Sequence, residues 1–218
     1  MHGYWLEFSA VAATHLIAVA SPGPDFAIVL RQSLVFGRRT AILTSIGIGT
    51  AILLHVGYSL LGLGLLIQSS PGWFAAVKYA GAAYLAWLGV QSLRAKPRSP
   101  ADVAGGEGGA GAVGAAGLPT ARAAFATGFL TNALNPKATL FFISLFVMIV
   151  SPQTPKLVQA AYGVWMTGVT MAWFALVSVG FTRADVRRNF LRHGHWIDRV
   201  LGAVFLAFAG SLLFTAGR

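Results

Sequence analysis

Hydrophobic residues along this chain come in long blocks, and the polar positions gather between them. A membrane-spanning helix needs about 20 consecutive apolar residues, and most of the blocks reach that length. Six blocks stand out, at 6–34, 41–67, 73–93, 123–150, 157–181 and 197–214. This pattern predicts an all-α integral membrane protein with six transmembrane helices.

The first and fourth blocks contain residues that interrupt a helix. Block 6–34 contains Ser21, Pro22, Gly23, Pro24 and Asp25, and block 123–150 contains Asn132, Asn135, Pro136 and Lys137. Proline has no N–H, so each proline leaves a carbonyl one turn earlier without its helical partner. In lipid such unsatisfied groups are tolerated only where the backbone is buried in protein or lines a wet cavity. The pattern therefore predicts two broken helices whose breaks lie at an internal site.

The order Ser21-Pro22 is typical of a helix N-terminus. Serine is a preferred N-cap residue, and proline is favoured at the first helical position. We expect the second half of the first broken helix to begin here. Its N-terminus would present the N–H groups of Gly23 and Asp25 to an anionic group such as a carboxylate.

The two interruptions match each other. Pro24 and Pro136 are 112 residues apart, and at this offset Asp25 falls on Lys137, so each proline precedes one charge of opposite sign. Three predicted helices separate the breaks, and an odd number inverts the second unit relative to the first. The pattern predicts two inverted-topology repeats, with a binding site where they meet. A single transmembrane transporter domain, 1–218, would comprise repeat one (1–98), a linker (99–120) and repeat two (121–218).

Two segments differ from the apolar blocks: the stretch that joins the repeats, and the N-terminus. In the first, residues 102–117 are almost entirely Gly and Ala with single acids, and such a segment buries too little surface to order itself. We interpret it as a flexible cytoplasmic linker. The N-terminus has no Lys or Arg before its first block and no evident cleavage site, so no removable signal peptide is expected.

The basic residues predict an orientation. Lys and Arg number 16 against 6 acidic residues, for a net charge of +10. Twelve of the 16 lie in or beside the first, third and fifth connections: Arg31, Arg38, Arg39, Arg94, Lys96, Arg98, Arg122, Arg183, Arg187, Arg188, Arg192 and Arg199. By the positive-inside rule these connections are cytoplasmic and both termini face outward. The charge therefore indicates contact with anionic lipid headgroups, and not with nucleic acid.

Composition excludes several kinds of chemistry. The chain is 56% hydrophobic and 10% charged and contains no cysteine, which excludes disulfides, thiolate metal sites and cysteine nucleophiles. An enzyme would need a nucleophile with a positioned base. Ser21 is a poor nucleophile, because it lies at the break and no histidine stands at a close helical offset. We therefore expect no catalytic residue, no bound metal and no cofactor.

Two interpretations of Asp25 and Lys137 remain open. They can form a structural ion pair that holds the two halves together, or they can bind a zwitterion. In the second case Lys137 and the helix N–H groups would take a carboxylate, while Asp25, Asn132 and Asn135 would take an ammonium group. Desolvation disfavours a charged carboxylate and a nearby cation favours it, so Asp25 would also couple proton movement to transport.

Histidines inside apolar blocks are weaker candidates. His55 lies near the middle of block 41–67, and His15 lies in the first half of block 6–34. A lone histidine in such a place is more often a packed residue than a proton carrier. We keep His55 as a secondary candidate, together with Tyr84 in the small-residue stretch of block 73–93.

These motifs resemble a known family. The stretch 21–25, followed by Gly37-Arg38-Arg39 and Gly47, resembles the first signature of the lysine exporter (LysE/RhtB) family of amino-acid efflux proteins. The stretch 128–132, with Asn135-Pro136-Lys137-Ala138 and Phe141-Phe142, resembles the second. Further likeness occurs at Ser70-Pro71, 81–85, Gly89, Gly202 and Gly210, whereas the long Gly/Ala linker is a departure.

The resemblance implies a bacterial inner-membrane exporter of amino acids or their derivatives, driven by the proton gradient. Its functional weight falls on the two proline motifs with Asp25, Asn132, Asn135 and Lys137. The implied partners are a small-molecule amino acid, protons and membrane lipid, and a homo-oligomer is compatible with it. The alternative is an exporter of a metal or other inorganic ion on a related scaffold. That alternative is weakened by the absence of cysteine and the separation of His15 from His55, because a metal site needs several convergent ligands.

Overall fold

The regular elements of the protein are α-helices throughout the part of the chain that the structure describes. The computed structural model describes residues 2–21, 23–69, 71–96 and 118–214. The helices are α1 (His2–Ala20), α2 (Pro24–Val35), α3 (Arg38–Ser69), α4 (Pro71–Leu93), α6 (Ala121–Ala133), α7 (Pro136–Met148), α8 (Lys156–Gly180) and α9 (Ala184–Phe214). Pro22 and most of the predicted linker 99–120 lie outside the described residues.

Several helices have the length and composition of membrane spans. Among the described residues, α3 (over Arg38–Leu61) and α8 are long and apolar enough to cross a membrane. Helices α1 and α2 pass the same test together as one bent span, with 51° between them, and α7 is a shorter apolar helix. The protein is therefore all-helical with candidate membrane helices.

Both predicted helix breaks are present. Helix α1 ends at Ala20 and α2 begins at Pro24, while α6 ends at Ala133 and α7 begins at Pro136. At the second break Asn135 is the N-cap, and its side chain accepts a hydrogen bond from the Lys137 backbone N–H at 2.9 Å. Local sequence therefore determines where α7 starts, because Asn and Pro occupy the N-cap and the first helical position that they prefer.

The predicted cap of the first break is wrong. Helix α2 starts at Pro24 rather than Pro22, and its N-cap is Gly23, an extended residue that makes no side-chain cap bond. The Ser21 hydroxyl instead accepts a hydrogen bond from Lys137 Nζ at 2.7 Å. Two prolines both suit a first helical position, and a contact from the other broken helix competes for the serine.

The predicted fifth connection is also too long. Helix α9 begins at Ala184, well before the apolar block at 197, so the basic positions from Arg187 to Arg199 are helical. Hydropathy marks the part of a helix that suits lipid. A helix continues into polar sequence because each added residue adds a backbone hydrogen bond.

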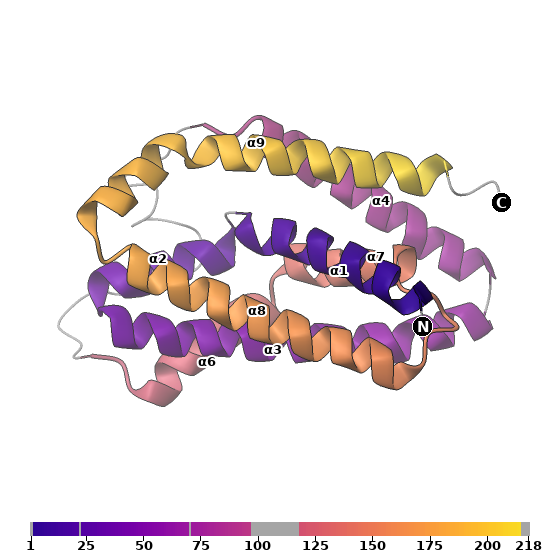
Figure 1. Cartoon of the computed structure of the whole chain (residues 1–218), viewed down its shortest axis with the longest axis horizontal. Helices are drawn as coiled ribbons and strands as arrows, with labels where there is room; N and C mark the ends of the chain where they lie inside the picture. Colours follow the sequence, from indigo (N-terminus) through magenta and orange to yellow (C-terminus); the bar gives the residue numbers. More distant parts are fainter. Residues whose placement is uncertain (1, 22, 70, 97–117, 215–218) are drawn as a thin grey trace.

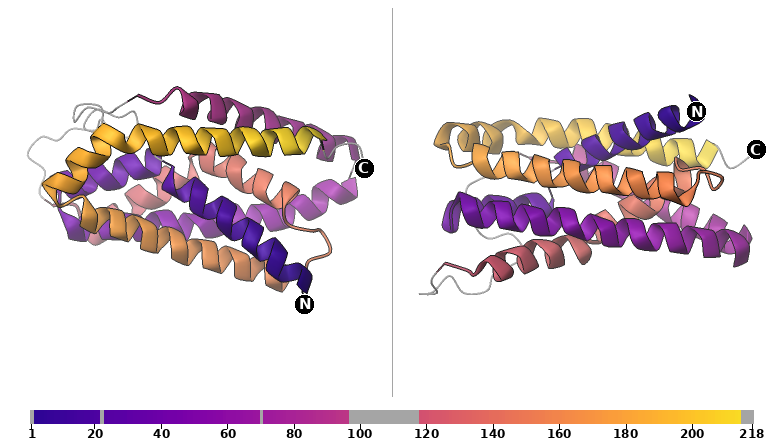
Figure 2. Two further views of the ribbon diagram at one scale, coloured as in Figure 1. Left: turned by 45° about the horizontal axis from the view of Figure 1, so that its top comes forward. Right: turned by 60° about the horizontal axis from the view of Figure 1, so that its bottom comes forward.

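The helices are arranged around the two broken ones. Helices α4 and α9 run beside each other along one side of the molecule (Figure 1). On the opposite side α3 packs against both α6 and α8. The broken helix α1–α2 and the half-helix α7 pass between these groups, as the rotated views also show (Figure 2). Both breaks are thereby placed inside the bundle.

Glycines allow α3 and α6 to pack with their backbones almost in contact. A Cβ atom at Gly47 would lie 2.1 Å from the carbonyl oxygen of Phe125, and one at Gly128 would lie 2.0 Å from that of Thr44. Real Cβ atoms do not approach so closely. These two glycines therefore set the distance between α3 and α6.

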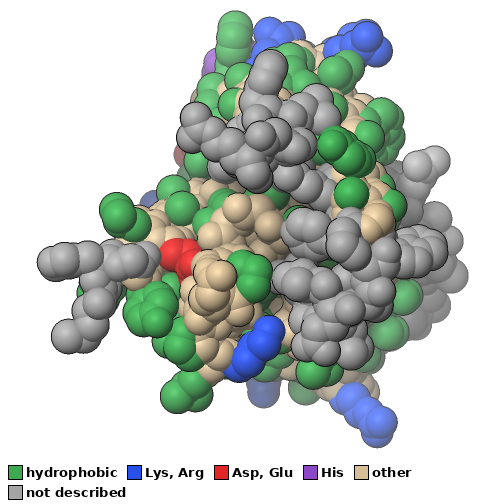
Figure 3. Space-filling view, turned by 90° about the vertical axis from the view of Figure 1, so that its right-hand side faces the viewer, with side chains coloured by type: hydrophobic (Ala, Val, Ile, Leu, Met, Phe, Trp, Pro, Cys, Tyr) green, Lys and Arg blue, Asp and Glu red, His purple; other side chains and the backbone are tan. Residues whose placement is uncertain are grey.

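Charged residues are distributed unequally between the two ends of the bundle. Helices α2, α4 and α8 end, and α3, α6 and α9 begin, at the left of Figure 1. The arginines of that end include Arg31, Arg38, Arg39, Arg94, Arg122, Arg183 and Arg188. The opposite end shows mainly hydrophobic and uncharged side chains among the described residues, with sparse basic ones (Figure 3). The segregation of charge inferred from the sequence is thus present in three dimensions.

A single acid at the opposite end ties α1 to the second half of the chain. The Glu7 carboxylate accepts hydrogen bonds from the Ser151 backbone N–H at 2.9 Å and from the Thr154 hydroxyl at 3.0 Å. Both donors lie in the connection between α7 and α8. The outer end of α1 is therefore anchored to this connection.

Candidate functional site

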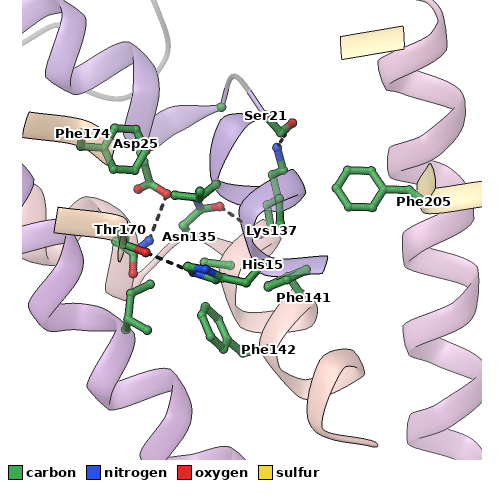
Figure 4. Close-up of a pocket in the computed structure, with 16 residues that line it drawn as sticks. His15, Ser21, Asp25, Asn135, Lys137, Phe141, Phe142, Thr170, Phe174 and Phe205 are labelled. Carbon is green, nitrogen blue, oxygen red and sulfur yellow. Dashed lines mark hydrogen bonds between the residues drawn. The ribbon is translucent and has the colours of Figure 1, made fainter. Parts of the chain in front are cut away.

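The two breaks face each other and exchange hydrogen bonds. Asp25, in the first turn of α2, accepts at Oδ2 from Asn132 Nδ2 at 3.0 Å and from Asn135 Nδ2 at 3.2 Å. Lys137, in the first turn of α7, donates to Ser21 at the end of α1. Each charged side chain thus reaches the break that does not carry it (Figure 4). The structure brings together the polar residues that the sequence singled out at the two breaks.

A cavity opens at this meeting point. Its volume is about 60 Å³, and since one water needs at least about 10–15 Å³ measured in this way, the cavity has room for a small solute. Its described lining includes His15, Ser21, Gly23, Asp25, Asn132, Asn135, Lys137, Phe141, Phe142, Thr170, Phe174 and Phe205. The candidate site is thus a real hollow in the bundle.

Only one oxygen of the Asp25 carboxylate accepts hydrogen bonds from the described residues. Both asparagine amides donate to Oδ2, whereas no described residue donates to the buried Oδ1. A buried acceptor without a partner costs about 1–3 kcal/mol, and more when it is charged. Oδ1 is therefore suited to accept a hydrogen bond from a ligand ammonium group or to carry a proton.

Lys137 supplies the opposite charge on the other side of the cavity. Its Nζ atom lies near Ser21 and Gly23, and 6.0 Å from the centroid of the Phe205 ring on α9. In Figure 4 the lysine side chain extends away from Asp25 toward the end of α1. The cavity therefore presents a carboxylate and an ammonium group to the same small space.

A second polar pair lines the cavity between α1 and α8. His15 Nε2 and the Thr170 hydroxyl are 3.1 Å apart, and both side chains are 2% exposed. No described residue bonds His15 Nδ1. Nothing in the sequence singled out Thr170, which lies inside an unbroken apolar block. His15 was interpreted as a packed residue, because a lone histidine in an apolar block more often packs than carries a proton.

Phenylalanines form the apolar walls. Phe141 and Phe142 come from α7, Phe174 from α8 and Phe205 from α9. The pair 141–142 belongs to the second motif of the sequence, but Phe174 and Phe205 carry no local signal. Such residues can be assigned to the cavity only once the helices are packed.

The remaining candidates lie outside the lining. Pro24 and Pro136 are the first residues of α2 and α7, so they determine where these helices begin but do not line the cavity. Tyr84 lies on α4, where its ring is 5.5 Å from that of Trp87, and it is not among the lining residues. His55, on α3, does not line the cavity either, but it is hydrogen-bonded to Asn132 on α6.

Within the described part of the chain no three His, Asp or Glu side chains gather as metal ligands would.

Comparisons with known proteins show a consistent likeness. The family model described as LysE type translocator matches residues 16–216. The threonine efflux protein of Salmonella typhi is 31% identical over 208 residues, which cover 95% of this chain and 98% of the relative. The threonine efflux protein of Escherichia coli K12 is 31% identical over 210 residues, with the same coverage. The leucine efflux protein of Klebsiella pneumoniae is 29% identical over 215 residues, 93% of this chain and 91% of the relative. No solved structure matches the chain.

Proposed function

Because the chain belongs to the family of LysE type translocators, we propose that it exports an amino acid or a derivative across the bacterial cytoplasmic membrane. It is a multi-pass membrane protein and a transporter rather than an enzyme. The efflux activities in the names of its relatives support an amino-acid substrate. The observation that carries the proposal is that Asp25, whose buried Oδ1 has no donor among the described residues, and Lys137 line one small cavity.

The two charges suit the two ends of a zwitterion. The ammonium group of the substrate donates to Asp25 Oδ1, and its carboxylate lies toward Lys137 and the backbone N–H groups at the start of α2. A helix N-terminus favours an anion in this position. Asn132 and Asn135 hold the other oxygen of Asp25 and so fix the carboxylate in place.

Proton antiport follows from the same oxygen. Asp25 Oδ1 can hold a proton or a substrate ammonium group, but not both at once. Substrate leaves the outward-facing site as a proton binds, and the proton leaves to the cytoplasm as the next substrate binds. Competition for one atom thereby couples the two movements in opposite directions.

The size and polarity of the cavity favour a short side chain with a hydroxyl group, such as that of threonine. With the charged groups of the substrate at the breaks, its side chain lies toward His15 and Thr170. This pair can exchange a hydrogen bond with a hydroxyl. The threonine efflux activity named for two relatives agrees with this choice.

Replacing Thr170 by Val tests the role of this pair. We expect the KM for threonine to rise about 2- to 10-fold, the value of one neutral hydrogen bond, while the KM for valine, which has the same shape, changes little. Competition uptake assays with both amino acids measure this. Thr167→Val is the control, because Thr167 is buried on the same helix and does not line the cavity. Equal losses for threonine and valine would contradict the proposal.

Reciprocal glycine contacts support two inverted repeats, 1–98 and 121–218, joined by the linker 99–120. A Cβ at Gly89 would meet the carbonyl oxygen of Gly202 at 2.9 Å, and one at Gly202 would meet that of Gly89 at 2.7 Å. In the same way Gly49 of α3 faces α8, and Gly163 of α8 faces α3. Each pair is separated by nearly the offset of the two breaks, as a pseudo-two-fold axis requires.

Six spans complete the proposed arrangement. The first is the broken helix α1–α2, the second to sixth are α3, α4, α6–α7, α8 and α9. The arginine-rich end faces the cytoplasm, and both termini face outward. Basic side chains at that end contact anionic lipid headgroups.

Transport by the purified protein tests the proposal. The chain is reconstituted in liposomes, and labelled threonine, leucine and lysine are offered with and without an imposed pH gradient. We expect exchange of a neutral amino acid with or without the gradient. Net movement against the proton flow should occur only with the gradient and should stop when an uncoupler removes it. Net amino-acid movement that ignores the gradient would contradict antiport. Absence of any amino-acid flux, with flux of an inorganic ion, would favour the alternative exporter.

A further inference from the structure

His55 contacts a residue of the site, Asn132, without lining the cavity. It lies on α3 and is 0% exposed. Its Nε2 atom is 3.1 Å from both the backbone oxygen and the side-chain Oδ1 of Asn132. Its Nδ1 atom is bonded to the Tyr58 hydroxyl one turn further along the helix. Every polar atom of this buried ring therefore has a partner.

The partners determine which nitrogen of His55 carries a proton. Asn132 Nδ2 donates to the Asp25 carboxylate, which can only accept, so the oxygen of the same amide is the atom that faces His55. The Asn132 backbone oxygen is also an acceptor. Both neighbours of Nε2 are acceptors, so Nε2 must be the donor. In the neutral ring Nδ1 is then an acceptor. The single proton of the Tyr58 hydroxyl goes to this close nitrogen rather than to the Thr139 backbone oxygen, which is 3.4 Å away.

We propose that His55 is a positioning residue for the transport site, acting through Asn132. Its Nε2–H holds Asn132 Oδ1 and thereby keeps the amide N–H₂ group aimed at Asp25 Oδ2. This inference rests on the proposed function, because it assigns Asp25 Oδ1 to the substrate. The result is a continuous hydrogen-bonded series, Tyr58–His55–Asn132–Asp25, that links α3, α6 and α2.

The orientation of the Asn132 amide matters because its two ends have opposite hydrogen-bonding roles. Turned by 180°, the amide would place its oxygen against the Asp25 carboxylate, and two acceptors would face each other. Asp25 Oδ2 would retain only the Asn135 donor. The carboxylate would then turn in the cavity, and Oδ1 would no longer face the substrate. A donor at position 55 prevents this turn.

Two substitutions of His55 distinguish the effect of its hydrogen-bond donor from the effect of its side-chain volume. His55→Leu fills the space without a donor, whereas the amide nitrogen of Gln in His55→Gln can occupy the place of Nε2. We expect the KM for amino-acid exchange to rise at least 10-fold in His55→Leu and to stay within 3-fold of wild type in His55→Gln. His193→Leu is the control, because His193 is exposed and bonds only Asn189 of its own helix turn among the described residues. Equal KM values in His55→Leu and His55→Gln would overturn the proposal.

A double substitution tests whether His55 acts through Asn132. If it does, His55→Leu adds no more than 2-fold to the KM of an Asn132→Ala protein, although it raises the KM of the wild type 10-fold. Residues in one network are coupled in this way, whereas independent residues multiply their effects. A full 10-fold increase in the Asn132→Ala background would overturn the proposed route.

Nitrogen NMR of the histidine rings provides a measurement that does not depend on transport. The chain has 5 histidines, and the His55 signals are those lost in His55→Gln. We expect a neutral ring protonated at Nε2 in detergent-solubilised wild type. Tyr58→Phe should keep this tautomer, because both acceptors on Asn132 remain, but should shift the Nδ1 signal, because Nδ1 loses its donor. A ring protonated only at Nδ1 would overturn the role of His55 while leaving the proposed function intact. An Nε2–H ring in a protein without amino-acid flux would overturn the proposed function instead.

Discussion

An Asp25→Asn protein is expected to lose amino-acid transport while remaining folded. Asparagine has the shape of aspartate, and its oxygen can accept from Asn132 and Asn135 as Oδ2 does now. Its N–H₂ group would then occupy the place of Oδ1 and face the substrate ammonium group. Removing one partner of a buried charge pair costs about 2–5 kcal/mol, which corresponds to a loss of about 30- to several thousand-fold in affinity.

Exchange of labelled amino acid in liposomes measures this loss, and gel filtration in detergent checks that the variant remains monodisperse. Asp185→Asn is the matched control, because Asp185 is exposed and pairs with Arg188 on its own helix. It should transport as wild type does. Wild-type exchange by Asp25→Asn would show that Asp25 is structural and would remove the basis of both zwitterion binding and proton coupling.

The second large effect concerns folding. Gly47→Ala places a methyl group 2.1 Å from the backbone oxygen of Phe125, and a backbone atom cannot move aside as a side chain can. Overpacking of this kind costs about 1–3 kcal/mol. For a chain of this size we expect the Tm to fall by roughly 2–12 °C and the yield of monodisperse protein to drop.

Gly57 provides the control on the same helix. A Cβ atom at Gly57 would meet nothing within 4 Å, so Gly57→Ala adds no clash and improves helix propensity by about 0.5–1 kcal/mol. Thermal denaturation in detergent, followed by fluorescence or by loss of the monodisperse peak, compares the two variants. Equal Tm values for Gly47→Ala and Gly57→Ala would contradict the close α3–α6 packing.

The polar half of the site could be predicted from the sequence because lipid makes its residues conspicuous. A proline, an amide or a charge inside an apolar block has few stable solutions. Asp25, Asn132, Asn135 and Lys137 were therefore singled out, and the structure places them around one cavity. The family that these motifs indicated is confirmed by the match of the LysE model to residues 16–216.

The apolar half could not be predicted in the same way. In a membrane helix the lipid-facing and protein-facing positions are both hydrophobic, so periodicity does not separate Phe205 from its neighbours. Thr170 and His15 gained their significance only when α8 was placed beside α1. Tyr84 was a candidate from its small-residue surroundings; it packs against the hydrophobic core and is not among the residues that line the cavity.

Helix ends were predicted well only where capping is local. Asn135 and Pro136 start α7 without help from the rest of the chain. Ser21 has a cap-like sequence, but it bonds Lys137, which is remote in the sequence. The early start of α9 was missed because a polar helical turn and a polar loop have the same hydropathy.

The distribution of polar groups around the cavity also has a stereochemical consequence. Asp25, Lys137 and the His15–Thr170 pair reach the cavity from four helices: Asp25 from α2, Lys137 from α7, and the pair from α1 and α8. A zwitterion whose two charged groups were held at the first two points could still rotate about the line between them, and a contact of its side chain with the third point would fix its orientation. Only one enantiomer then directs a hydroxyl to the third point. Three unlike contacts of this kind would make the proposed substrate site a chiral selector, in which the mirror-image amino acid satisfies two contacts but not the third.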